Sequence, residues 1–165
     1  RLGRKQRKGG RVPAWIAVLR YASAAAVGLT FFTVLLFFVP QFGFAPLYRG
    51  RNLWYHLIIP VLAMLNYCLL FPAEKPRLAQ SAWTLAPMLL YGAAYILNLA
   101  LNGVGAWPDT NDWYGFVTWG YPVGIGIFAA LALMTWGLAL LLRLAKGKAW
   151  ALQEKAAASE PGETL

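Results

Sequence analysis

Four apolar stretches, each long enough to cross a lipid bilayer, dominate this sequence. A helix needs roughly 20 apolar residues to cross about 30 Å of hydrocarbon. A chain of 165 residues, 59% of them hydrophobic, cannot hide them all in a soluble core. No strand-like alternation competes with this interpretation. The sequence therefore predicts an all-α, polytopic transmembrane bundle with four spans, near residues 19–39, 53–71, 83–102 and 121–142.

Basic residues are distributed unequally over the two ends of these spans. Of the 15 Lys and Arg residues, all but Arg49 and Arg51 fall on one side of a four-span arrangement. By the positive-inside rule, both termini of this chain face the cytoplasm. This topology explains the net charge of +9, and no aromatic-interleaved motif accompanies the charge, so no nucleic acid partner is expected. Membrane lipids are an expected partner, because the basic residues 1–11 attract anionic headgroups.

The predicted spans divide the sequence into three parts. These are a basic cytoplasmic segment (1–18), a transmembrane domain (19–142) and a basic to polar cytoplasmic tail (143–165). We expect the polar tail from Gln153 onward to be disordered. Prolines are expected to mark the connecting loops, at positions 40, 46, 72, 76 and 108. A basic segment that leads straight into a span, without a signal peptide, suggests that further helices precede it in a longer protein.

His56 is the only histidine, and it lies three residues into the second predicted span, near the outer surface. Hydrocarbon solvates an ionisable side chain poorly, so the imidazole must find water, a polar partner or a function. One interpretation is catalytic, because histidine can deprotonate a hydroxyl or water near neutral pH. The other is structural: His56 donates to a carbonyl freed by Pro60, since proline removes one helix hydrogen bond.

A polar stripe follows one face of the third predicted span. At 100° per residue its members lie within about 40° of one another: Thr84, Tyr91, Tyr95, Asn98 and Asn102. We expect this stripe to face protein and not lipid. It can serve as interhelical hydrogen bonds, worth about 1 kcal/mol each, or as part of a binding site.

Polar residues from several elements are predicted to share one layer near the outer surface. Thr33 of the first span, for example, lies about 10 Å below that surface at 1.5 Å per residue. The set combines a histidine, a hydroxyl, amides and carboxylates, which are the parts of an acyl hydrolase for an amphiphilic ester or amide: His56, Thr33, Asn98, Asn102, Asp109 and Asp112. One histidine and one cysteine cannot complete a zinc site, and no glycine-rich phosphate loop is present, so no metal or cofactor is expected.

One segment carries His-x-x-x-Pro on a span: Leu53–Leu70, LWYHLIIPVLAMLNYCLL. It resembles the androgen-induced and androgen-dependent membrane proteins and their bacterial relatives. Two further segments, LRYASAAAVGLTFFTVLLFF and NDWYGF, are similar to the bacterial branch, and the likeness covers about residues 19–142. The resemblance implies a multi-pass enzyme of a bacterial plasma membrane. It would hydrolyse lipid esters, in particular fatty acid esters of hydroxy fatty acids, with threonine as nucleophile and histidine as its partner.

The family histidine corresponds to His56, whereas the family's threonine motif has no match in this chain. Thr33 and Thr30 are the only first-span threonines and therefore the candidate nucleophiles. The substrate-binding candidates are the polar residues of the third span and its loop: Asn98, Asn102, Tyr95, Tyr91 and Asp112. One alternative is a non-enzymatic binding or transport module for a small amphiphilic solute, with the polar stripe lining its path. Another is a packing or assembly subunit.

Overall fold

The computed structural model describes residues 12–106, 109–112, 115–118 and 120–159. These residues form helices joined by short connections, and the described ranges contain no strand. Four helical spans are long and apolar enough to cross a membrane: Ala14–Phe42, Arg51–Leu70, Leu78–Asn102 and Tyr121–Ala156. The chain is therefore a membrane protein of the predicted all-α class, and the prediction of four spans is confirmed.

Several of the spans are composite helices. The first comprises α2 (Ala14–Thr33), the π-helical turn η1 (Val34–Phe38) and α3 (Val39–Phe42). A connection with α4 (Phe44–Leu47) leads to the second span, which comprises α5 (Arg51–Leu53), the π-helical turn η2 (Trp54–Ile58), α6 (Ile59–Leu65) and the π-helical turn η3 (Asn66–Leu70). The third comprises the 3₁₀ helix η4 (Leu78–Leu85) and α7 (Ala86–Asn102), and the fourth is α8 (Tyr121–Ser159).

The three π-helical turns share one sequence feature, a proline two residues after the last residue of the turn: Pro40, Pro60 and Pro72. Proline lacks an N–H, and its ring collides with the carbonyl four residues earlier. In each case the residue before the proline bonds to the carbonyl five residues back, which widens the turn and relieves the collision. The prediction that Pro40 marks a connecting loop is therefore wrong, because Pro40 lies inside α3, within the first span. Pro46 lies in the connection between the first two spans, in the short helix α4, and Pro108 lies outside the described residues.

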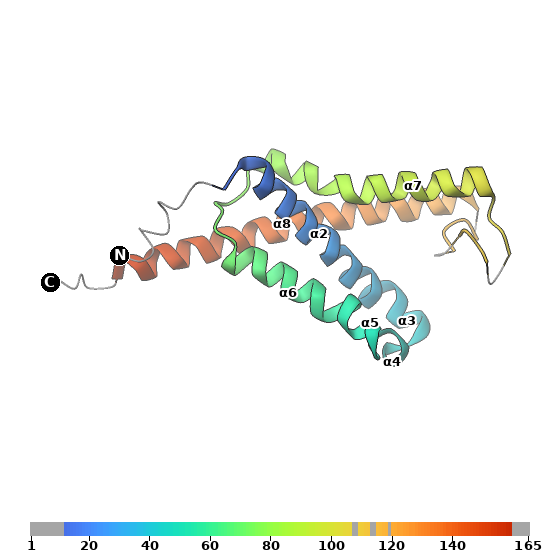
Figure 1. Ribbon diagram of the computed structural model, residues 1–165, viewed down its shortest axis with the longest axis horizontal. Coiled ribbons are helices and arrows are strands. Elements are labelled where there is room, and N and C mark those ends of the chain that lie inside the picture. The colour runs from blue at the N-terminus through green and yellow to red at the C-terminus, as the bar shows by residue number, and fades with distance from the viewer. Residues whose placement is uncertain (1–11, 107–108, 113–114, 119, 160–165) are drawn as a thin grey trace.

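The spans form two helix pairs that diverge (Figure 1). α2 packs antiparallel against α6, and Gly28 of α2 is so close to Met64 that a Cβ there would lie 2.9 Å from its sulfur. α7 lies along α8, where the rings of Tyr95 and Phe128 are 6.0 Å apart. The pairs meet near the loop of residues 71–77, which we name the basic end, and separate toward the connections 43–50 and 103–120, which we name the outer end.

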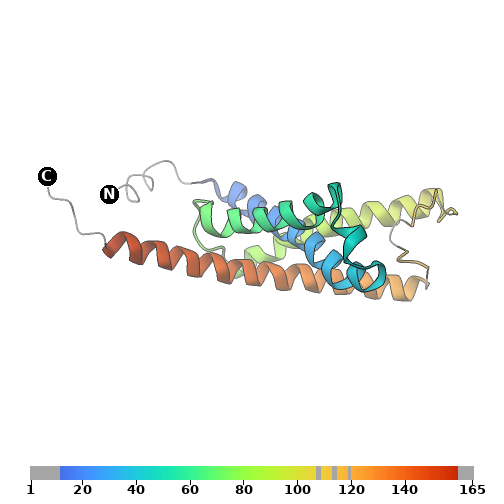
Figure 2. The same cartoon turned by 90° about the horizontal axis from the view of Figure 1, so that it is seen from below.

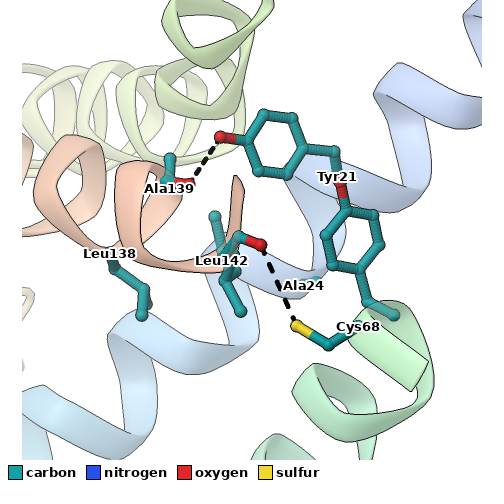
Figure 3. Packing of buried hydrophobic residues seen from close by; sticks show 8 residues of the cluster. Tyr21, Ala24, Cys68, Leu138, Ala139 and Leu142 are labelled. Atoms are coloured by element: carbon teal, nitrogen blue, oxygen red, sulfur yellow. Dashed lines mark hydrogen bonds between the residues drawn. The ribbon is translucent and has the colours of Figure 1, made fainter. Parts of the chain in front are cut away.

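A buried core at the basic end joins three of the spans (Figure 3). The Tyr21 hydroxyl donates to the carbonyl of Ala139 in α8 at 2.6 Å, and the Tyr21 ring stacks on Tyr67 at 5.4 Å. Small residues complete the cluster on α2, with Ala24 at 4% and Ala25 at 0% exposure. This packing fixes α2, the second span and α8 relative to one another.

α8 extends well past the predicted end of the fourth span at residue 142 (Figure 2). Its 39 residues correspond to about 58 Å, almost twice the thickness of the hydrocarbon layer. The prediction of disorder from Gln153 onward is wrong for the stretch up to Ser159, and residues 160–165 lie outside the described residues. The Ala, Gln, Glu and Lys residues of this stretch favour a helix, and Gln153 Nε2 donates to the carbonyl of Leu69 at 2.9 Å.

Candidate functional site

His56 lies at the outer end of the second span, in the middle of η2 and one turn before the fully buried Pro60. Its Nδ1 is 3.0 Å from the carbonyl oxygen of Leu47, in the connection before the span. A carbonyl only accepts hydrogen bonds, so Nδ1 carries a proton, and in the neutral form of the ring the lone pair is on Nε2. In the described part of the chain Nε2 has no hydrogen-bond partner.

The acceptor of the His56 proton differs from the one expected for a purely structural histidine. Pro60 frees the carbonyl of His56 itself, four residues earlier, whereas the observed acceptor is Leu47. The bond therefore ties the outer connection to the second span and does not repair the helix around Pro60. π-Helical turns of the kind that holds His56 are frequent at functional sites.

Tyr48, which directly follows Leu47, is a residue that the sequence did not single out. Its side chain is 8% exposed, and its hydroxyl is buried without a hydrogen-bond partner among the residues that the structure describes. The Tyr48 ring packs against Phe44 with centroids 4.2 Å apart. Burial raises the pKa of Tyr48 above its usual value of 10.0, so the phenol is a proton donor at neutral pH. The only sequence signal for it is the run of aromatic residues in this connection.

Thr33 differs from the other buried hydroxyl residues of the spans. Thr84, Thr135 and Ser81 donate to carbonyls of their own helices at 2.6, 2.7 and 2.7 Å. The Thr33 hydroxyl is also buried, yet it has no partner in the described chain. It lies at the last residue of α2, where the helix widens into η1. Thr30, the other candidate nucleophile, is exposed.

The structure places Thr33 and His56 at similar depths but does not join them. Counted outward from the contact between Gly28 and Met64, Thr33 is about 7 Å and His56 about 12 Å farther along the helix axes. The depths therefore differ by roughly one turn. Around α2, however, Thr33 lies about 140° from Gly28, and its hydroxyl makes no hydrogen bond to His56.

Asp112 is the centre of a second polar group, at the outer end of α7. The carboxylate is 6% exposed and accepts hydrogen bonds from the Tyr95 hydroxyl, from Phe116 N at 2.9 Å and from Val117 N at 3.0 Å. Three donors satisfy this buried charge. The carboxylate therefore holds the loop after α7 on the helix itself.

The amides of this region form a chain of hydrogen bonds. Asn102 Nδ2 donates to Asn98 Oδ1 at 2.7 Å, and Asn98 Nδ2 donates to Asn111 Oδ1 at 3.3 Å. Asn111 donates in turn to the carbonyl of Gly103 at 2.9 Å. These contacts close the loop onto the end of α7. Together with Asp112 they confirm that third-span and loop residues come together, and they form a network directed at the chain's own backbone.

The polar stripe of the third span faces protein only in part. Thr84 and Tyr95 are buried, as predicted, and Asn98 is half-buried. The prediction is wrong for Tyr91, which is 46% exposed, and for the exposed Asn102. The reason is the divergence of α7 from α2 toward the outer end, which leaves one side of α7 uncovered (Figure 1).

The predicted pocket, with histidine, amides and carboxylates in contact, is not formed among the described residues. His56 lies with the α2 and α6 pair, and the Asp112 network lies with the α7 and α8 pair, at tips that are separate in Figure 1. No group of three or more His, Cys, Asp and Glu side chains that could hold a metal ion occurs in the described ranges. Comparison with protein-family models, curated proteins and solved structures finds no match.

Proposed function

We propose that the protein hydrolyses esters of amphiphilic lipids at the outer end of its first two spans, with His56 as the general base. The observation that carries the proposal is the state of the imidazole, whose Nδ1–H is engaged by Leu47 O at 3.0 Å while Nε2 has no partner among the described residues. A histidine held in one tautomer by a carbonyl is a competent base near neutral pH. The resemblance of this segment to a family of lipid-ester hydrolases adds to this support.

In the proposed reaction, Nε2 of His56 accepts the proton of a hydroxyl group. The oxygen of that hydroxyl group bonds at the same time to the ester carbonyl carbon. The positive charge on the imidazolium is stabilised by the Nδ1–H bond to Leu47 O. The tetrahedral intermediate then expels the alcohol oxygen, which takes the proton from Nε2. If Thr33 supplies the hydroxyl, water removes the acyl group in a second cycle; if water attacks directly, one cycle is enough.

Tyr48 takes the stabilising role in this proposal. A phenol O–H without a partner can donate to the oxyanion that forms on the ester carbonyl, and the phenol is one residue from the carbonyl that orients His56. Asn98 and Asn102 were predicted for this role, but their amides are bonded within the network at the end of α7. The alternative function, in which the polar stripe of the third span lines a path for a solute, stays a prediction.

The substrate class follows from the depth of the site. Large aromatic side chains around the connection and the start of the second span are exposed: Phe42 at 61%, Phe44 at 57%, Trp54 at 56% and Tyr55 at 60%. Such residues gather at the boundary between hydrocarbon and water. A substrate with a polar ester group and an apolar chain, such as a fatty acid ester of a hydroxy fatty acid, fits this boundary. By the positive-inside rule the site faces away from the cytoplasm.

The test uses the full chain in liposomes with a hydroxy-fatty-acid ester as substrate. We expect His56→Ala to lower turnover by about 10²–10⁴-fold, the contribution of a general base. Thr33→Ala distinguishes the two attacking groups, because it abolishes labelling by a fluorophosphonate only if Thr33 forms the acyl intermediate. Thr30→Ala is the matched control, since this threonine is exposed. Unchanged turnover in His56→Ala would overturn the proposal.

A further inference from the structure

Four of the cations in and beside the loop of residues 71–77 are named here the basic cluster: Arg20 of α2, Lys75 of the loop, and Arg143 and Lys146 of α8. Lys146, 3% exposed, donates to the carbonyl of Phe71 and lies 3.5 Å from that of Cys68. Cys68 O is the carbonyl four residues before Pro72, and the proline leaves it without a helix partner. Arg143 Nε donates to the carbonyl of Pro76 at 2.9 Å. These two residues of α8 hold the loop in place.

Arg20 and Lys75 complete the cluster from the two sides of the loop. The Arg20 guanidinium is 5.5 Å from the Phe71 ring centroid and donates to Asn66 Oδ1 at 2.7 Å. Lys146 Nζ is 6.0 Å from the same Phe71 centroid. One ring thus contacts both charges. Lys75 crosses α8 at Gly147, where a Cβ would lie 2.9 Å from Lys75 Cδ and 3.4 Å from its Nζ.

No carboxylate of the described residues, Glu74 of the same loop included, pairs with this charge. Every hydrogen-bond acceptor of the basic cluster is an uncharged amide or carbonyl oxygen, and none of the four cations pairs with a carboxylate in the part of the chain that the structure describes. Like charges held close together at the edge of a low-dielectric layer repel one another. An anion from outside the chain would relieve that repulsion.

We propose that the basic cluster binds the phosphate headgroup of an anionic lipid. Arginine and lysine recognise phosphate oxygens through charge-assisted hydrogen bonds, and Arg20 and Lys75 are exposed and available for them. A lipid is favoured over a soluble phosphate because exposed leucines border the cations at the same depth: Leu19 at 57%, Leu70 at 73% and Leu144 at 50%. The headgroup meets the cations while the acyl chains cover these leucines. This site is independent of the chemistry at His56.

The experiment measures lipid binding to the full chain in nanodiscs. Phosphatidylcholine alone is compared with phosphatidylcholine that contains phosphatidylglycerol, and bound lipid is counted by native mass spectrometry. We expect Arg20→Gln and Lys75→Gln each to weaken retention of phosphatidylglycerol about fivefold, and the double variant about 25-fold, at about 1 kcal/mol per charge. Both substitutions are at exposed positions and spare Arg143 and Lys146, which hold the loop.

The matched control is the double variant Arg49→Gln, Arg51→Gln, which removes the same charge at the outer end. It is expected to retain phosphatidylglycerol like the unmodified chain. Equal loss in both double variants would overturn the proposal, because attraction would then depend on net charge and not on this cluster. Displacement of the lipid by an equal concentration of glycerol phosphate would also overturn it, since the ligand would then be a soluble phosphate.

Discussion

The outer ends of the two helix pairs carry polar side chains in opposite states of hydrogen bonding. At the end of α7, the buried Asp112 carboxylate has three donors, and Asn98 and Asn102 are bonded in a chain. At the end of the first two spans, the hydroxyls of Thr33 and Tyr48 are buried and have no partner within the described ranges of the chain. Leaving a buried polar group unpaired costs about 1–3 kcal/mol. The first arrangement stabilises the fold, and the second leaves groups available for a ligand.

The presence or absence of a hydrogen-bond partner separates structural from functional candidate residues more clearly than burial or depth does. Tyr48 and Tyr95 are both buried, at 8% and 2% exposure, and both lie toward the outer end. Of the two, the hydroxyl of Tyr95 donates a hydrogen bond to another residue of the described chain, Asp112. A buried polar group that the chain does not satisfy calls for an explanation such as water, a ligand or a catalytic role.

The largest expected effect comes from the satisfied network. Asp112→Ala leaves the Tyr95 hydroxyl and the amides of Phe116 and Val117 without their acceptor. We expect the unfolding free energy to fall by about 2–4 kcal/mol, because several donors lose their partner at once. Ester turnover per folded molecule should not change, since this network lies apart from His56. Denaturant unfolding in micelles measures the first quantity, and liposome turnover measures the second.

The control is Asp109→Ala, which removes a carboxylate from an exposed position of the same loop. It is expected to change stability by less than about 0.5 kcal/mol. A loss of turnover in folded Asp112→Ala would mean that the two outer ends act as one site, and the contrast between them would fail.

The second prediction compares one substitution at two positions. Tyr95→Phe removes a donor to a buried carboxylate and is expected to lower stability by about 2 kcal/mol. Tyr48→Phe removes a buried hydroxyl that has no partner and is expected to raise stability by about 1 kcal/mol. The opposite signs are the diagnostic result, measured by denaturant unfolding of both variants. Equal destabilisation would show that the Tyr48 hydroxyl has a partner in the folded protein.

The proposed role of Tyr48 adds a second measurement on the same variant. If the phenol donates to the oxyanion, Tyr48→Phe lowers turnover by about 10²–10³-fold while stability rises. This combination separates a functional group from a packing residue, because a packing residue loses activity and stability together.

The sequence predicted the fold well because the bilayer leaves few options for such a chain. Backbone groups must be satisfied within each span, so length and hydropathy are enough to count four helices. The helix ends were harder. Pro40 lies within α3 because a π-helical turn relieves its steric conflict. α8 continues to Ser159, and the Gln153 side chain bonds this extension to Leu69 of the second span.

The sequence predicted how deep each candidate residue lies along its span, but not which candidate residues lie beside one another. Counting residues along a span places His56, Thr33 and Asn98 in one layer near the outer end. It does not determine which helices pair, and the divergence of the two pairs separates His56 from Asn98 (Figure 1). The tautomer of His56 depends on Leu47, a backbone acceptor with no side-chain signature in the sequence. Tyr48 could not be distinguished from the many other aromatic residues without knowing that its hydroxyl is unpaired.

The smallest expected effect is the alkaline pH dependence of stability. Burial raises the pKa of Tyr48 in the folded protein above 10.0, whereas the unfolded chain releases this proton near pH 10, the usual value for tyrosine. The folded state therefore keeps the phenol proton to a higher pH than the unfolded state does, so the contribution of Tyr48 to the unfolding free energy is fully present below about pH 10 and is lost as the pH rises toward the folded pKa.

Relative to Tyr48→Phe, the unmodified chain should lose unfolding free energy only above about pH 10. Tyr121→Phe, at a side chain that is 70% exposed, controls for the loss of one phenol. Parallel curves for the unmodified chain and Tyr48→Phe would show that the phenol is solvated, and the contrast with Tyr95 would then rest on Asp112 alone.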